Sequence, residues 1–314
     1  MEVVKIGTRG SVLALWQANW VRSQLLQMHP QCQVEIVKIK TTGDKILDVP
    51  LAQVGGKGLF VKEIETALLE KRVDLAVHSM KDMPAEIPPG LCIGVVPERE
   101  NPLDVLISRN GHKFNDLPQG ARIGSSSLRR GAQVLHARPD MTIHPLRGNL
   151  DTRLKKLETE GLDAIILAAA GVRRLGLEDR ITEYIPETMM LPAIGQGALS
   201  IEIRENDKAI EKMTAPLEHR ETRMAVDCER AFLARLEGGC QVPIAGQAKV
   251  TGDRVEMNGM VAEIDGSVLI HETITGPVDR RVALGEELAD RLLERGGKEI
   301  LDIVYGKAVQ DLKP

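Results

Sequence analysis

The feature that most constrains the fold of this chain is an alternation, over its first two hundred residues, of short apolar runs with segments of helical period. The apolar runs lie at 3–6, 34–40, 73–77, 104–108 and 163–168, and loops separate them from the helix-like segments. This alternation is typical of βαβ units and of a mainly parallel sheet. The sequence therefore predicts an α/β protein.

Two breaks in this pattern predict a division into lobes. Proline and glycine interrupt it at 98–102 and at 191–198, so we expect the chain to cross there between two lobes with a cleft between them. After about residue 220, a helical segment that ends in glycine, several strand-like runs and a final helical segment predict a smaller α+β domain. The predicted division assigns 1–98 with 195–218 to domain 1, 99–194 to domain 2 and 219–314 to domain 3.

The segment after the first apolar run has a helical pattern. Val12, Trp16 and Trp20 recur at i, i+4 and i+8 and so share one face of the predicted helix. We expect this face to belong to the core.

Composition and charge exclude several classes of protein. The chain of 314 residues is 43% hydrophobic and 27% charged, as soluble globular proteins are. It has no basic stretch followed by an apolar one at its start and no run of about eighteen apolar residues, so we expect a cytoplasmic protein without a membrane span. A net charge of -4 and an aromatic share of 2% disfavour nucleic acid as a partner. No strong interface signature is present, which favours a monomer.

Cys240 stands in an unusual setting, directly after two glycines and before a Gln-Val-Pro run. Glycine and proline predict a turn or an exposed loop there. The four cysteines are far apart and contain no C-x-x-C pair, which argues against a disulfide framework and against a zinc site. A reactive thiol and an ordinary loop cysteine both remain open at this point.

Polar and cationic side chains gather where the predicted strands end. Between Ala121 and Lys155 there are seven arginines and lysines but only two carboxylates, a local balance of 7 − 2 = +5 in a chain of net charge -4. Carboxyl ends of strands and amino ends of helices form the binding crevice of open α/β sheets. The pattern predicts an anion site, and the alternative is a set of serine-capped helices with solvated arginines. The residues concerned are Thr8, Arg9, Ser11, His78, Ser79, Lys81, Asp82, Ser125, Ser126, Ser127, Arg129, Arg130, Arg147, Asn149 and Arg153.

Two further features concern the same predicted cleft. The glycine-rich run at 54–60 lacks the spacing of a phosphate loop, and a lid that contributes Lys57 fits it better. Asp82, beside Lys81, is suited to stabilise positive charge on a substrate or to transfer protons. The alternative is a structural aspartate in a turn before Pro84.

Eight stretches together resemble one family. The sequence resembles the porphobilinogen deaminase (hydroxymethylbilane synthase) family over essentially its whole length. The stretches that carry the resemblance are GTRGSVLALWQ, GGKGLFVKEIE, DLAVHSMKDMP, GSSSLRR, LRGNLDTRL, DAIILAAAGVRRLG, LPAIGQGA and LEGGCQVPIAG.

The resemblance implies a fold and an activity. It implies two lobes like those of type II periplasmic binding proteins, followed by a smaller domain that carries a dipyrromethane cofactor on a thioether to Cys240. Four porphobilinogen molecules are condensed head to tail with loss of ammonia, and 1-hydroxymethylbilane is released. No metal is implied.

The resemblance also implies roles for individual residues. Asp82 matches the aspartate that stabilises the cationic azafulvene formed as ammonia leaves. Lys81, Ser127, Arg129 and Arg130 match residues that bind the cofactor's carboxylates. Arg9, Ser11, Arg147, Arg153 and Arg174 match residues that hold substrate or the growing chain, with Gln17 close to them. Lys57 and Phe60 match the lid.

Two other classes of function are considered. A solute-binding protein would suit the predicted lobes, but the absence of a secretion signal and the presence of the Cys240 motif count against it. A phosphate-transfer enzyme lacks a phosphate loop and a clear pair of magnesium-binding carboxylates.

Overall fold

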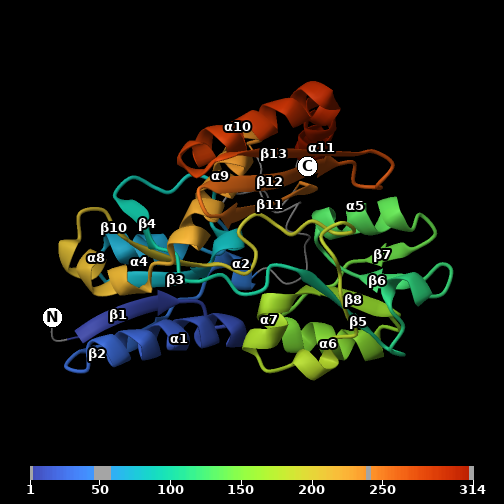
Figure 1. Cartoon of the computed structure of the whole chain (residues 1–314). Helices are drawn as coiled ribbons and strands as arrows, with labels where there is room; N and C mark the ends of the chain where they lie inside the picture. Colours follow the sequence, from blue (N-terminus) through green and yellow to red (C-terminus); the bar gives the residue numbers. More distant parts are fainter. Residues whose placement is uncertain (1–2, 46–57, 238–241, 311–314) are drawn as a thin grey trace.

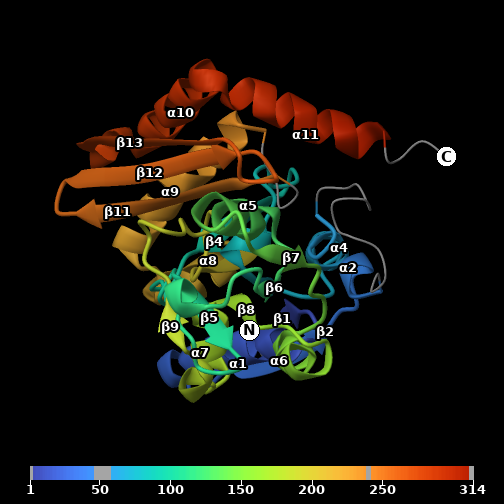
Figure 2. The same cartoon turned by 90° about the vertical axis from the view of Figure 1, so that its right-hand side faces the viewer.

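In the computed structural model, which describes residues 3–45, 58–237 and 242–310, the strands form two five-stranded sheets and one three-stranded sheet (Figure 1). We call the parts built on them lobe 1, lobe 2 and domain 3. Lobe 1 and lobe 2 lie side by side, and domain 3 lies across both, as two perpendicular views show (Figures 1 and 2).

Lobe 1 is built on a sheet with the order β2-β1-β3-β10-β4. Its strands are β1 (Val3–Thr8), β2 (Gln33–Lys38), β3 (Leu75–Ser79), β4 (Leu91–Val95) and β10 (Leu199–Arg204). Strand β1 runs parallel to β2 and β3, whereas β10 runs antiparallel to β3 and β4. One strand therefore opposes the direction of the other four.

Helices cover both faces of this sheet because its strands are apolar on both sides. Alternate residues of β3 face opposite ways: Leu75 and Val77 pack with α1 (Val12–Met28) and α8 (Lys208–Thr214), and Ala76 packs with α4 (Lys62–Leu69). A short helix α2 (Thr42–Lys45) follows β2.

Lobe 2 repeats this arrangement with the order β7-β6-β8-β5-β9. Its elements are β5 (Asp104–Ser108), β6 (Arg122–Gly124), α5 (Leu128–Ala137), β7 (Thr142–His144), α6 (Leu150–Thr159), β8 (Ala164–Ala168), α7 (Ala169–Arg174) and β9 (Glu183–Tyr184). Here β6 runs parallel to β7 and β8, and β5 runs antiparallel to β8 and β9.

Two connections join the lobes. The chain passes from β4 to β5 through 96–103 and returns from β9 to β10 through 185–198. The strand β10 therefore belongs to the sheet of lobe 1, although it follows all the strands of lobe 2 in the sequence. The segments 98–102 and 191–198, where proline and glycine interrupt the sequence pattern, lie within these connections.

Domain 3 consists of an antiparallel sheet, β11-β12-β13, covered by helices. Its elements are α9 (Arg220–Arg235), β11 (Ile244–Thr251), β12 (Arg254–Ala262), β13 (Leu269–Pro277), α10 (Arg281–Leu292) and α11 (Lys298–Gln310). Phe232 of α9 is fully buried in the core between sheet and helices, and Ile194 of the returning connection packs into the same core. This contact ties domain 3 to the joint between the lobes.

The predicted fold class is confirmed: two α/β lobes precede a smaller α+β domain. The exact domain boundaries stay a prediction. Within the described ranges, no helix is long and apolar enough to span a membrane.

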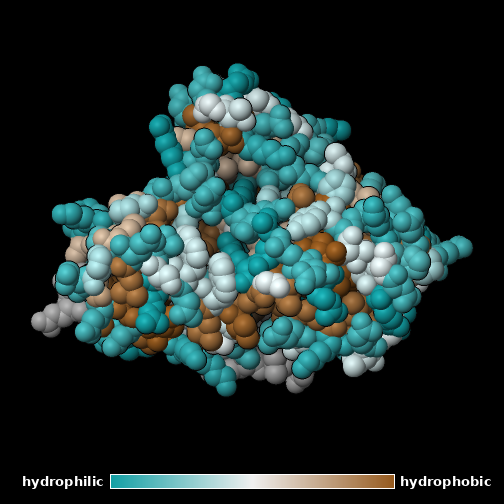
Figure 3. Space-filling model, turned by 60° about the horizontal axis from the view of Figure 1, so that its bottom comes forward, coloured by the Kyte–Doolittle hydropathy of each residue, from teal (hydrophilic) through white to brown (hydrophobic). Residues whose placement is uncertain are grey.

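One expectation about the core is wrong for two of its three residues. Val12 and Trp16 are 50% and 36% exposed, whereas Trp20 is half-buried and packs against the core of lobe 1. The buried face of α1 is formed by Ala14, Gln17, Ala18, Val21 and Leu25 instead. Hydrophobic atoms gather on the side of the molecule that carries α1 and α7 (Figure 3).

Candidate active site between the lobes

The polar residues that follow β1 and β3 line one pocket. Because these strands are parallel neighbours, their carboxyl ends meet at one edge of the sheet. Arg9 and Ser11 follow β1, while His78, Ser79 and Asp82 come from the end of β3 and the turn after it. The pocket brings the Arg9 cation and the Asp82 carboxylate together.

Arg9 is held in place on two sides. Its Nε and Nη2 lie 3.1 Å and 2.5 Å from Oδ1 of Asp44, and its guanidinium lies over the Phe60 ring at 4.1 Å from the centroid. Burial alone would raise the pKa of the Asp44 carboxyl, but the hydrogen bonds and charge of Arg9, together with hydrogen bonds from Thr41, lower that pKa. Phe60, a predicted lid residue, therefore orients a cation of the pocket.

The first helix contributes two polar side chains. Ser11 is the N-cap of α1 and its hydroxyl accepts a hydrogen bond from the Ala14 amide at 3.3 Å. One turn further, Gln17 is buried and its Nε2 donates to Oγ of Ser79 at 2.9 Å. The helix thus fixes the strand end from which Asp82 follows.

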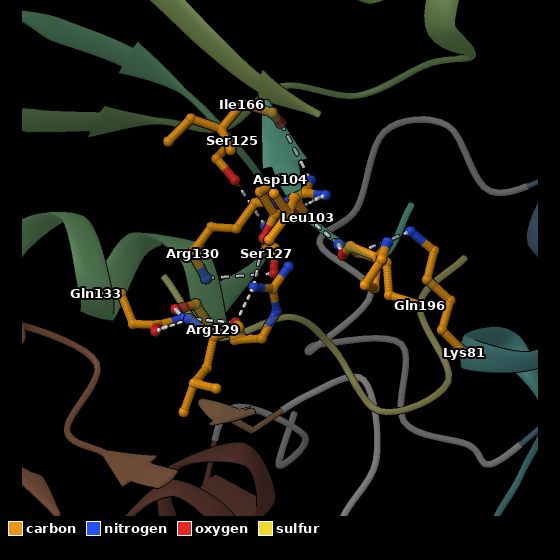
Figure 4. A network of polar contacts seen from close by, with 12 residues as sticks. Lys81, Leu103, Asp104, Ser125, Ser127, Arg129, Arg130, Gln133, Ile166 and Gln196 are labelled. Carbon is orange, nitrogen blue, oxygen red and sulfur yellow. Dashed lines mark hydrogen bonds and ion pairs between the residues drawn. The ribbon is translucent and has the colours of Figure 1, made fainter. Parts of the chain in front are cut away.

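On the lobe 2 side, α5 presents two buried arginines. Ser127 is the N-cap of this helix, as one reading of the sequence proposed. Arg129 and Arg130, however, are only 4% and 5% exposed, so the reading with solvated arginines is wrong. Both guanidiniums bind the carboxylate of Asp104, Arg129 at 2.6 Å and Arg130 at 2.7 Å (Figure 4).

Asp104 is a buried counter-ion for these arginines. Burial alone would raise the pKa of its carboxyl, but the charges and hydrogen bonds of Arg129 and Arg130 hold that pKa well below its usual range. The oxygens of Asp104 already accept hydrogen bonds from these arginines, and Oδ1 also accepts one from Gln196 at 3.0 Å. One negative charge faces two positive ones, which leaves this end of lobe 2 cationic.

Gln196 joins the two lobes. It lies in the returning connection, is fully buried, and its Nε2 donates to the Pro102 carbonyl at 2.6 Å, while Lys81 Nζ approaches its Oε1 at 3.5 Å (Figure 4). The flanking glycines make the close fit possible: Gly197 has φ +88°, and a Cβ there would lie 2.3 Å from the Glu100 carbonyl oxygen.

Lys81 is a buried cation of the site. Burial lowers the pKa of its ammonium to about 8, and the charge of Arg130 acts in the same direction, against Asp82 and Asp104. A negatively charged ligand near Lys81 would keep it protonated.

Arg147 and Arg153 are two further cations of lobe 2. Within the described ranges, no carboxylate lies at ion-pair distance from Arg147 or Arg153, although Arg153 Nε donates to the Gly148 carbonyl at 2.9 Å. Burial lowers the pKa of Arg153 to about 10, Arg130 and Arg147 add to that effect, and Asp82 opposes it. Cations of lobe 2 and the carboxylate of lobe 1 therefore share one electrostatic site.

Arg174, at the end of α7, contacts the connection that returns to lobe 1. Its Nη2 donates to the Gly197 carbonyl at 2.8 Å and its guanidinium lies 5.8 Å from the centroid of the exposed Trp16 ring. Burial lowers its pKa to about 10. Trp16 therefore contacts a predicted binding residue.

Two predicted site residues, Lys57 and Cys240, lie outside the described residues. Three other residues of the site, Asp44, Asp104 and Gln196, were not predicted from the sequence. Gln196 lies in the stretch 191–198, where a crossing between the lobes was predicted, and Asp104 is the acidic first residue of an apolar strand. Across 3–45, 58–237 and 242–310, no group of three or more His, Cys, Asp and Glu side chains could hold a metal ion.

Two family models match this chain. The family model described as "Porphobilinogen deaminase, dipyromethane cofactor binding domain" matches residues 4–212, and "Porphobilinogen deaminase, C-terminal domain" matches residues 224–294. A solved structure of a Salmonella typhimurium periplasmic binding protein specific for arginine is 14% identical, covers 71% of this chain and 94% of its own, and has a TM-score of 0.39.

Curated relatives are similar over almost the full length. A protein of Pelobacter propionicus named porphobilinogen deaminase is 54% identical over 98% of this chain and 98% of its own. One of the same name from Geobacter metallireducens is 57% identical over 98% and 96%. With both of its family domains matched and relatives this similar from end to end, the chain belongs to the porphobilinogen deaminase family.

Proposed function

We propose that the cleft between the lobes binds porphobilinogen and the growing chain through their carboxylates, and that Asp82 stabilises the positive charge that develops as ammonia leaves. One observation carries this proposal. Arg153 forms no ion pair at contact distance with a carboxylate among the described residues, but its charge interacts electrostatically with those of Arg147 and Asp82.

The family supplies the reaction. The enzyme is a transferase that condenses four porphobilinogen molecules head to tail, with loss of ammonia, and releases 1-hydroxymethylbilane for tetrapyrrole and heme biosynthesis. Each substrate brings two carboxylates, so a lengthening chain requires many cations inside a protein of net charge -4. The cationic end of lobe 2 meets this requirement.

The cofactor of the family is dipyrromethane. When bound, it supplies the covalent primer on which the chain is built. The residues described around its proposed site fit a group with several carboxylates, because Asp104 neutralises only part of the charge of Arg129 and Arg130. Lys81, Ser127, Arg129 and Arg130 would hold these carboxylates, and the thiolate of Cys240 would form the thioether.

Arg9, Ser11, Arg147, Arg153 and Arg174 would hold the substrate and the growing chain. Arg9 already has a carboxylate partner in Asp44, so a substrate carboxylate would share or replace that partner. Phe60 would keep the Arg9 guanidinium oriented during this exchange, and Lys57 would add a cation from the lid. A monomer in the cytoplasm remains the expectation from the sequence.

Intact-protein mass spectrometry tests the attachment site. The wild-type chain should carry the extra mass of two linked pyrrole units, and Cys240→Ser should carry none. Cys32→Ser is the matched control, because Cys32 is a half-buried free thiol that should leave the extra mass unchanged. An active wild-type chain without extra mass, or a Cys240→Ser chain that keeps it, would contradict the proposal.

A further inference from the structure

Trp16 of α1 is a large aromatic side chain that remains 36% exposed. Its ring lies against the guanidinium of Arg174 on α7, with 5.8 Å between Cζ of Arg174 and the ring centroid. A cation within about 6 Å of a tryptophan face is attracted by the π electrons of the ring. The partner of Trp16 is therefore a cation at its surface rather than the core beneath its helix.

This contact crosses the boundary between the lobes, because α1 belongs to lobe 1 and α7 to lobe 2 (Figure 1). The two helices pack directly on each other, since a Cβ added at Gly171 of α7 would lie 3.5 Å from Cδ2 of Leu13 on α1. Leu13 also lines the pocket that contains Asp82. Trp16 follows Leu13 by three residues and so lies on the same side of the helix. The aromatic contact thus lies next to the part of α1 that forms the pocket.

Arg174 keeps hydrogen-bonding capacity for a ligand. Among the described residues it has no carboxylate at ion-pair distance, and Glu100, whose charge acts on it, already pairs with Arg173 at 2.9 Å. Nη2 of Arg174 donates to the Gly197 carbonyl at 2.8 Å, and within the described ranges its other nitrogen atoms have no hydrogen-bond partner. These donors can receive a carboxylate.

The carbonyl that holds Arg174 is itself fixed in place. It also accepts a hydrogen bond from the Glu100 amide at 3.2 Å, and the backbone of Gly197 has φ +88°. Two residues earlier, a Cβ at Gly195 would lie 2.6 Å from Cγ of Met80, in the turn that follows β3. The guanidinium is therefore held between a closely packed turn and an aromatic ring.

The ring and the carbonyl have different effects on this cation. A single hydrogen bond leaves a guanidinium able to rotate about that bond, and a ligand that binds it must then pay for the lost freedom. An aromatic face restricts this motion without adding a negative charge. Arg9, in contrast, is paired with the carboxylate of Asp44. The ring of Trp16 thus orients Arg174 and leaves its positive charge for a ligand.

We propose that Trp16 is a positioning residue for Arg174. Its ring, carried by lobe 1, holds the guanidinium of lobe 2 in the orientation that receives a substrate carboxylate. This inference rests on the proposed function, in which Arg174 holds substrate or the growing chain. It assigns to Trp16 an action through Arg174 and no direct part in the chemical step.

Steady-state kinetics of the full-length, cofactor-loaded chain with porphobilinogen test the inference. Trp16→Leu should raise KM about two- to fivefold, the effect expected for a partly exposed cation–π contact, and should leave kcat nearly unchanged. Trp16→Phe should recover most of the loss, because a phenyl face also attracts a cation. Trp20→Leu is the matched control on the same helix, since Trp20 packs against the core of lobe 1 and its loss should lower stability but not raise KM.

A double variant tests whether Trp16 acts through Arg174. Arg174→Gln should raise KM at least about tenfold, because a charge-assisted hydrogen bond to the substrate is lost. When Trp16→Leu is added to Arg174→Gln, KM should rise no further, since the ring then has no cation to orient.

Tryptophan fluorescence measures the contact without substrate. The sequence contains two tryptophans, so Trp20→Phe leaves Trp16 as the single one. In that background, Arg174→Gln should change the emission of Trp16, because it removes the charge beside the ring. Arg180→Gln, which alters an exposed arginine beyond α7, should not change it. This measurement decides if Trp16→Leu fails to fold.

Four outcomes would overturn the inference. They are a wild-type KM in Trp16→Leu, an equal rise of KM in Trp20→Leu, a further rise of KM when Trp16→Leu is added to Arg174→Gln, and Trp16 emission that Arg174→Gln leaves unchanged. With any of these, a raised KM in Arg174→Gln alone would still support the proposed function. A wild-type KM in Arg174→Gln would instead contradict the substrate role of Arg174, and the positioning role of Trp16 with it.

Discussion

Arg130 holds Asp104 through two of its nitrogen atoms, with Nε at 3.0 Å and Nη2 at 2.7 Å from the same carboxylate oxygen. The pair joins the first residue of β5 to the first turn of α5, and both side chains are buried. This geometry fixes the direction in which Arg130 can present its remaining donors. Asp104 is therefore a positioning residue for the proposed carboxylate site.

Asp104→Asn should strongly destabilise lobe 2. The change keeps the side chain's shape but leaves Arg129 and Arg130 as neighbouring buried cations without a counter-ion. Breaking a buried ion pair in this way costs about 3–5 kcal/mol, which denaturant unfolding would measure. Glu70→Gln is the control, because the Glu70–Arg72 pair is exposed and its loss should cost at most about 1 kcal/mol. Similar losses in the two variants would refute this role of Asp104.

Asp82→Asn should retain the fold and the covalent cofactor but lose at least about 100-fold in kcat, because an amide cannot offset the developing positive charge. Ammonia release measures the rate, and intact mass measures the cofactor. Asp116→Asn, which changes an exposed aspartate of lobe 2, should behave as wild type. A normal rate in Asp82→Asn would mean that another group stabilises the charge.

Much of the architecture could be predicted from the sequence because the period of apolar residues reports directly on local structure. The strand predicted at 104–108 is β5 with the same bounds, and the strand predicted at 73–77 is β3 at Leu75–Ser79. The helical period of Val12, Trp16 and Trp20 was misleading, since the spacing of these residues does not indicate which side of α1 packs on the sheet.

The site was harder to predict than the fold. Cations at strand ends marked Arg129 and Arg130 as site candidates, but their partner Asp104 is 25 and 26 residues away in the sequence and becomes adjacent only when β5 pairs with β8. His78 and Glu202 likewise pair only because β3 and β10 are neighbours in the sheet. Such pairs depend on tertiary contacts, which local patterns do not contain.

Gly43→Ala should weaken substrate binding without touching the substrate. A Cβ at Gly43 would lie only 2.2 Å and 2.4 Å from two atoms of the Phe60 ring. The ring must then shift, and a weaker cation–π contact with Arg9, worth about 0.5–2 kcal/mol when intact, should raise KM several-fold, with a smaller effect on kcat. In the control Gly10→Ala, the new Cβ meets nothing within 4 Å and KM should stay normal. An unchanged KM in Gly43→Ala would show that Phe60 does not orient Arg9.

The free energy of unfolding should depend on pH through Glu65. The pKa of Glu65 is raised from 4.5 to about 7 in the folded chain, chiefly by burial. Between these values the folded state binds more protons than the unfolded state, so the contribution of Glu65 is most favourable below pH 4.5 and is lost as the pH rises through about 7. A shift of this size corresponds to about 3 kcal/mol.

Glu65→Gln should remove this dependence. The free energy of unfolding of the variant, relative to the wild type, should therefore increase by about 3 kcal/mol as the pH is raised from 4.5 to 8. Urea unfolding of both chains across this range measures the difference. Ser200→Ala, with the same buried setting but no titration, should follow the wild-type slope at every pH. If the difference between Glu65→Gln and the wild type is constant from pH 4.5 to 8, then Glu65 does not hold a proton near neutrality.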